Sequence, residues 1–188
     1  MRISHTICFF LAAASLFSCS QQFKETSKSG LPNLDSLRAN TIPPPTFVRK
    51  ISDLNGFRDS VVISGGVQER DAVMEKLRLF NKPVFTDQYR KLIVEDSQSN
   101  LQIERWLADT KQAPIQQLEI YLNEQTNTWY AIKAIFNANN LLFKKEESIF
   151  VGLDPATSRI EAINITGKQK MFFFEEDNYS IDLKLLYP

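Results

Sequence analysis

The amino-acid sequence predicts an α+β domain, in which one or two helices pack on an antiparallel β-sheet with meander topology. The first observation is a helical period over residues 68–81, where Val73, Leu77 and Phe80 form an apolar stripe. The second is a series of alternating runs joined by short polar turns in the second half of the chain. Strands gathered after helices favour an antiparallel sheet over alternating βαβ units. An all-β sandwich or barrel is the alternative.

The first elements are a strand and the helix that follows it. Residues 60–64 form a Val- and Ile-rich run that ends at Gly65 and Gly66, which predicts a buried strand. Pro83 ends the helix predicted over residues 68–81. The glycine pair lacks the other residues of nucleotide-binding turns, so it indicates a plain strand-to-helix connection.

The stretch from residue 91 to residue 110 fits two structures. Residues 91–94 indicate a strand. Ser99 with Gln102 three positions later resembles a capping box, which favours a short helix over residues 100–110. The rival interpretation is a hairpin whose turn is formed by residues 96–100.

The pattern of the rest of the chain predicts successive strands. Leu118, Ile120 and Leu122 alternate with polar residues, and Asn- or Pro-containing turns separate the later runs. The expected strands lie at residues 115–122, 129–136, 141–151, 159–165 and 179–185.

The N-terminus carries a targeting signal. Arg2 precedes an apolar run over residues 6–17, which is too short to span a bilayer. The run ends in Leu16-Phe17-Ser18-Cys19, which resembles the lipobox of bacterial lipoproteins, with a bulky Phe17 where that pattern prefers a small residue. The resemblance implies that residues 1–18 are removed as a signal peptide and that Cys19 receives a diacylglycerol. It also implies acylation of the new amino group, with palmitate as the expected chain.

The same resemblance implies a location in the cell envelope. Ser20 follows the lipidated cysteine, and in enterobacterial sorting a residue other than Asp at that place favours the outer membrane. We therefore expect an outer-membrane lipoprotein facing the periplasm, with the cell surface or the inner membrane as alternatives.

Three segments follow from these patterns. Residues 1–18 form the signal peptide, and residues 19–46 form the lipidated cysteine and a flexible tether rich in Pro and Ser. Residues 47–188 form a single globular domain.

Composition excludes much chemistry. The only histidine is His5, and the two cysteines are Cys8 and Cys19, so the mature domain has neither an imidazole nor a free thiol. Such a domain lacks the groups of Ser-His-Asp and Cys-His catalysis and the usual ligands of zinc, haem and iron–sulfur clusters. We therefore expect no cofactor and no metal. The formal charge is balanced, which argues against a nucleic-acid partner.

Two groups of residues could still carry a function. The acidic runs at residues 146–147 and 175–177 fit solvated charge better than a catalytic pair, because adjacent strand residues face opposite ways. Phe172, Phe173 and Phe174 are consecutive, so at least one of them should lie off the main core. They are the candidate contact surface, and burial of all three is the competing interpretation.

The sequence thus predicts a lipid-anchored periplasmic binding or interaction module, and no catalysis is inferred. Its partners would be the membrane, through the anchor, and an envelope protein or an apolar ligand. The alternatives are a carboxylate-dependent hydrolase of envelope glycans and a carrier of lipid or apolar ligands.

Overall fold

The computed structural model describes residues 22–26, 45–65, 68, 71–72, 75, 89–96, 100–113 and 115–188. Ten strands account for most of these residues. They are β1 (Gln22–Thr26), β2 (Phe47–Leu54), β3 (Phe57–Ser64), β4 (Tyr89–Asp96), β5 (Leu101–Ala108), β6 (Ile115–Asn123), β7 (Trp129–Asn139), β8 (Phe143–Leu153), β9 (Ile160–Met171) and β10 (Glu176–Leu186).

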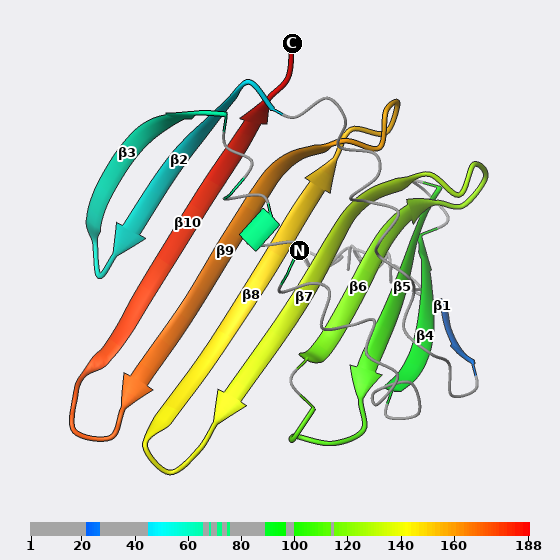
Figure 1. Ribbon diagram of the computed structural model, residues 1–188. Coiled ribbons are helices and arrows are strands. Elements are labelled where there is room, and N and C mark those ends of the chain that lie inside the picture. The colour runs from blue at the N-terminus through cyan, green and yellow to red at the C-terminus, as the bar shows by residue number, and fades with distance from the viewer. Residues whose placement is uncertain are drawn as a thin grey trace, which may run out of the picture.

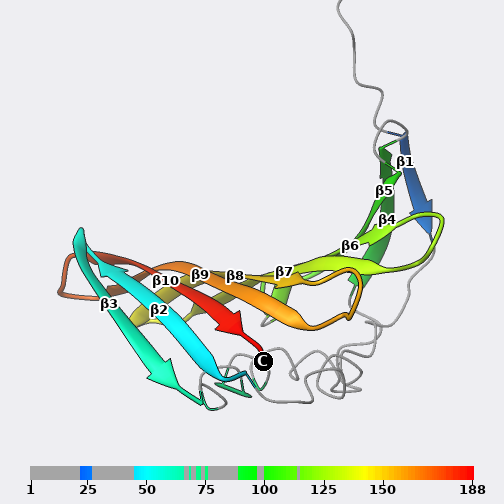
Figure 2. The same cartoon turned by 90° about the horizontal axis from the view of Figure 1, so that it is seen from above.

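All ten strands belong to one antiparallel sheet, in the order β1-β4-β5-β6-β7-β8-β9-β10-β2-β3 (Figure 1). The run from β4 to β10 is a meander, in which each strand pairs with the next along the chain. The β2–β3 hairpin then adds to the free side of β10. Figure 2 shows one layer whose β1, β4 and β5 end bends away from the plane of β7 to β10.

The predicted α+β class is wrong, because the residues that the structure describes form an all-β fold with only a few helical positions. Within the predicted helix at residues 68–81, Gln68, Asp71, Ala72 and Glu75 are helical, and the rest of that segment lies outside the described residues. The all-β alternative has the right class. The described strands, however, form a single open layer with β1 and β3 at its two edges, rather than a sandwich or a closed barrel.

The short helix predicted at residues 100–110 is also wrong, and the rival hairpin interpretation is confirmed. Residues 101–108 form β5, which pairs with β4 on one side and β6 on the other. Trp106 lies opposite Leu118 of β6 on one face, while Ile103 lies opposite Tyr121 on the other. Pairing on both sides outweighs a weak local helix signal, because strand propensity depends mainly on such neighbours.

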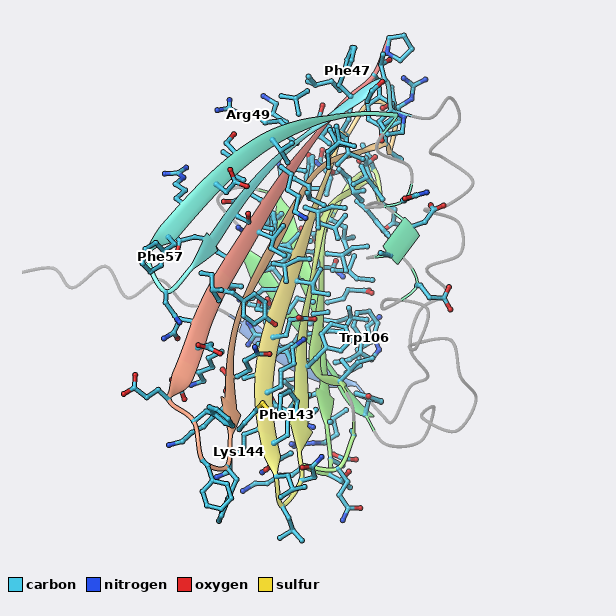
Figure 3. All side chains as sticks on the ribbon, turned by 60° about the vertical axis from the view of Figure 1, so that its left-hand side comes forward. Phe47, Arg49, Phe57, Trp106, Phe143 and Lys144 are labelled. Carbon is cyan, nitrogen blue, oxygen red and sulfur yellow. The ribbon has the colours of Figure 1, made fainter. Side chains whose placement is uncertain are left out.

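One face of the sheet holds the apolar core. In register across the strands, Leu118 lies opposite Ala134, Ala134 opposite Ile149, and Ile149 opposite Ile165. All four side chains are buried. We call this the core face, and the other the polar face. Figure 3 shows Trp106 on one side of the sheet and Arg49 of β2 on the other.

Both edges differ from what the sequence pattern suggests. β3 contains the run at residues 60–64 that reads as a buried strand, yet it is an edge strand with exposed Val61 and Val62. β1 lies within the segment predicted to be a tether and pairs with β4. The other predicted domain boundaries stay a prediction.

The turns of the meander divide between two ends of the sheet. Residues 140–142 and 172–175 connect strands at one end, which we call the tip end, and residues 124–128 and 154–159 do so at the other. Gln22 of β1 pairs with Glu95, close to the turn at Asn100, whose carbonyl accepts a hydrogen bond from the amide of Glu124. Gln22 therefore lies at the end of the sheet opposite the tip end.

Candidate functional site

The tip end carries a cluster of exposed apolar side chains on two neighbouring hairpins. Exposure reaches 92% for Leu141 and 86% for Phe173, and the other members are also more than half exposed. Soluble proteins seldom leave several large apolar side chains together in water, and such a group marks a contact site. We call this cluster the hairpin tip; its members are Leu141, Leu142, Phe172, Phe173 and Phe174.

Hydrogen bonds within and between the loops fix their shape. The amide of Phe172 donates to the carbonyl of Leu142 at 3.0 Å, which joins the β9–β10 loop to the β7–β8 loop. The amide of Leu142 donates to Oδ1 of Asn140 at 2.9 Å, and the amide of Phe174 donates to the carbonyl of Met171 at 3.0 Å. The rings of Phe172 and Phe173 meet edge to face at 4.7 Å. The hairpin tip is thus preorganised, which lowers the entropic cost of binding.

A hollow and a charged border adjoin the hairpin tip. The hollow measures about 420 Å³ and is lined mainly by apolar side chains, among them Leu142, Phe143 and Met171. Just behind it, Lys144 of β8 lies opposite Lys170 of β9, and Lys170 lies opposite Glu176 of β10. Figure 3 shows Phe143 and Lys144 at this end of the sheet.

The predicted contact residues Phe172, Phe173 and Phe174 all lie in this cluster. They form a turn between β9 and β10 rather than a strand, so their side chains do not alternate between the two faces. Leu141 and Leu142 were not predicted, because they read as the start of the next strand. The preceding Asn139-Asn140 pair is the signal that places them in a turn instead.

A buried carboxylate lies on the polar face, at the bend of the sheet. Glu119 of β6 is 3% exposed. Its Oε1 accepts hydrogen bonds from Nε of Arg105 at 2.6 Å and from Nε2 of Gln117 at 2.8 Å, and its Oε2 accepts from the hydroxyl of Tyr121 at 2.6 Å. Burial, followed by the bond to Glu119, raises the pKa of Tyr121 to about 12.

A second buried carboxylate lies on the core face. Glu147 of β8 is 5% exposed, and its Oε2 accepts a hydrogen bond from the Tyr179 hydroxyl at 2.6 Å and pairs with Nζ of Lys145 at 2.9 Å. Gly167 belongs to β9, the strand between β8 and β10, and lies opposite Glu147 on one side and Tyr179 on the other. The Tyr179 ring lies over this glycine. Burial, together with the bond to Glu147, raises the pKa of Tyr179.

These two carboxylates do not form a pair suited to acid–base catalysis. Glu119 lies opposite Lys133 on the polar face, whereas Glu147 lies opposite Phe136 on the core face, so the sheet separates them. Each already has a cationic partner and a tyrosine hydroxyl. Among the side chains whose burial the structure describes, they are the only buried acidic ones, and a glycosidase needs two carboxylates facing one cleft.

Other predicted features fall partly outside the structure. Cys19 and the signal peptide lie outside the described residues. Across the described ranges, no group of three or more acidic, His or Cys side chains is arranged to hold a metal ion. None of the helical residues in those ranges belongs to a helix long and apolar enough to cross a bilayer.

Comparison with known proteins identifies no relative of this chain. No protein-family model matches the chain, and neither the curated proteins nor the solved structures searched contain a match.

Proposed function

We propose that this protein is a lipid-anchored interaction module of the bacterial cell envelope, and that the hairpin tip is the surface that binds its partner. The exposure of five Leu and Phe side chains on two loops held together by the Phe172–Leu142 hydrogen bond carries this proposal. No catalytic step is assigned.

The position of the predicted anchor favours a partner away from the anchoring membrane. Cys19 precedes Gln22 by three residues, which span at most about 11 Å. Gln22 lies at the end of the sheet opposite the hairpin tip. The intervening strands are long: the 11 residues of β8 cover about 35 Å at about 3.3 Å per residue. A protein anchored at Cys19 would therefore hold the hairpin tip away from its own bilayer.

The chemistry of the border favours a protein partner over a lipid surface. The apolar centre is flanked by Lys144 and Lys170 and also by Glu175 and Glu176, so both signs of charge border it. An apolar centre with a polar rim is typical of protein–protein interfaces. A surface that binds anionic lipid would instead carry an excess of cations. We infer that the partner is an envelope protein with an apolar pocket.

Replacement of the three phenylalanines tests the proposal. A variant with Phe172→Ser, Phe173→Ser and Phe174→Ser should fold with unchanged stability, because these side chains are largely in water, and should lose its cross-linked partner in intact cells. Phe57→Ser is the matched control, since Phe57 is 84% exposed on the β2–β3 hairpin. A triple variant that keeps the same cross-linked partner would refute the proposed surface. If the wild-type chain instead binds protein-free vesicles and the triple variant does not, the partner is a lipid.

A further inference from the structure

Two cations face each other on the polar face, away from the hairpin tip. Arg49 of β2 lies directly opposite Lys184 of β10 in the strand register. Neither side chain makes an ion pair with another residue that the structure describes. Like charges directly opposite on neighbouring strands destabilise a sheet. A pair of this kind is therefore a candidate site for an anion.

The residues beside this pair leave room for a ligand. Lys184 lies opposite Ala162 of β9, and Ala162 lies opposite Gly152 of β8. A methyl group added at Gly152 would make only ordinary contacts, the nearest being the Ala162 Cβ at 3.7 Å. Across the four strands β2, β10, β9 and β8, two long cationic side chains are thus followed by two positions with almost no side chain. We call Ala162 and Gly152 the floor.

An open hollow of about 710 Å³ lies over this row and is lined by Arg49, Lys184 and Ala162, among others. Phe150, which is 39% exposed, lies next to the floor, and Arg159 lies at the border with its guanidinium 5.5 Å from the centre of the Tyr187 ring. A volume of this size is within the range of small-molecule sites.

The carboxylates around the hollow are largely engaged elsewhere. Asp182 accepts a hydrogen bond from the side-chain amide of Asn164. Asp154 accepts from the Thr157 hydroxyl at 2.7 Å and from the amide of Ala156 at 2.8 Å. Glu161 is the remaining acidic side chain at the border. None of these three carboxylates makes an ion pair with Arg49 or Lys184, so both cationic side chains can still reach a bound group.

We propose that this hollow binds a phosphate group, with Arg49 and Lys184 as its ligands. A phosphate monoester carries a charge of about −1.5 to −2 at neutral pH, which matches two facing cations. The guanidinium of Arg49 donates two parallel hydrogen bonds to phosphate oxygens, and Lys184 supplies a point charge. The rest of the ligand lies over Gly152 and Ala162, against the Phe150 ring. The group comes from a soluble phosphorylated compound or from a phospholipid headgroup.

Titration calorimetry on the purified full-length protein tests this site with two probes. Glycerol 3-phosphate represents the soluble source, and vesicles containing phosphatidic acid represent the lipid source. Arg49→Gln and Lys184→Gln should each weaken binding of the accepted probe about tenfold or more, because each removes charge-assisted hydrogen bonds. Lys168→Gln is the matched control, since Lys168 is on the same face but pairs with Glu146.

The proposal also predicts that Lys184→Gln weakens phosphate binding without lowering the stability of the fold. Without ligand, Lys184→Gln should unfold at the same urea concentration as the wild type or a higher one, because it removes a like-charge contact. Tenfold weaker phosphate binding with undiminished stability supports the site. Absence of binding by both probes, or equal weakening by Lys168→Gln, would overturn it. Loss of phosphate binding would leave the hairpin-tip proposal untouched, because the two surfaces share no residue.

Discussion

Gly167 is the residue on which one of the two buried carboxylate clusters depends. The position lies between Glu147 and Tyr179 in the strand register, and the absence of a side chain lets the tyrosine ring fold across it to reach the carboxylate. The tyrosine thereby shields the glycine backbone while its hydroxyl supplies a donor to a buried charge.

Gly167→Ala should destabilise the fold by about 1.5–3 kcal/mol, the contribution of a hydrogen bond to a charged group, because the Tyr179–Glu147 bond would be lost. The added Cβ would lie 2.5 Å from the Tyr179 hydroxyl, so the ring must move away from Glu147. Gly152→Ala, also in a strand, is the control and should change stability by less than about 0.5 kcal/mol. Urea unfolding measures both, and equal effects of the two alanines would contradict the assigned role of Gly167.

Tyr121 makes stability depend on pH in the alkaline range. An unfolded tyrosine ionises near pH 10, whereas burial and the bond to Glu119 raise the pKa of the folded Tyr121 to about 12. Between these values the unfolded chain loses a proton that the folded chain keeps, so stability is complete below pH 10 and falls as pH rises to 12. Tyr121→Phe should flatten this fall in unfolding experiments at successive pH values. Part of the slope should remain, because burial also raises the pKa of Tyr89 to about 12. Identical slopes in variant and wild type would refute the assignment.

At the scale of elements, the β2–β3 hairpin is attached to the sheet through its turn as well as through β10. Asn55 adopts a left-handed conformation with φ of 51° and is followed by Gly56 with φ of 87°. Its Nδ2 donates to Oδ1 of Asp177 at 2.8 Å, and its Oδ1 accepts from the amide of Asn178 at 2.7 Å. One side chain thus connects two hairpins.

Asn55→Gly should cost about 1 kcal/mol, because glycine keeps the backbone conformation but loses two side-chain hydrogen bonds. Asn127→Gly is the control, since Asn127 also has a positive φ of 56° and its side chain makes no hydrogen bond to any described residue. Asn55→Gly should therefore unfold at a lower urea concentration than Asn127→Gly. Equal midpoints would show that the turn contacts add no stability.

The sequence predicts the strands of the meander well where each run alternates and ends at a polar turn. β6 and β10 follow this rule. β2 does not, because its charged and polar residues Arg49, Lys50 and Ser52 occur on both faces, and pairing with β10 and β3 makes it a strand. The error at β5 has a similar origin. Its apolar residues serve both faces of the sheet, so no single period is visible.

The candidate site could be predicted only in part. Three consecutive phenylalanines indicate that not all of them reach the core, and the structure has all three exposed. The proximity of Leu141 and Leu142 to Phe172 depends on β8 and β9 being neighbours in register, which a single sequence does not specify. The same holds for Arg49 and Lys184, which are 135 positions apart in the chain and face each other across β2 and β10.

For the whole molecule, the arrangement of the sheet relates the predicted anchor to the proposed contact surface. Gln22, just after Cys19, and the hairpin tip lie at opposite ends of the strands. An open sheet with binding residues at one end and an attachment at the other suits a protein that presents a surface to a partner. The phosphate site proposed on the polar face would add a second function on a separate surface.

Site-specific photo-cross-linking in intact cells is the most direct test of the central claim. A photoreactive phenylalanine analogue at position 173 should form a covalent complex with one envelope protein, and the additional change Leu142→Ser should reduce its yield. The same analogue at position 156, in the exposed turn at the opposite end, should not capture that protein. Absence of a complex at position 173, or the same complex from both positions, would contradict the account.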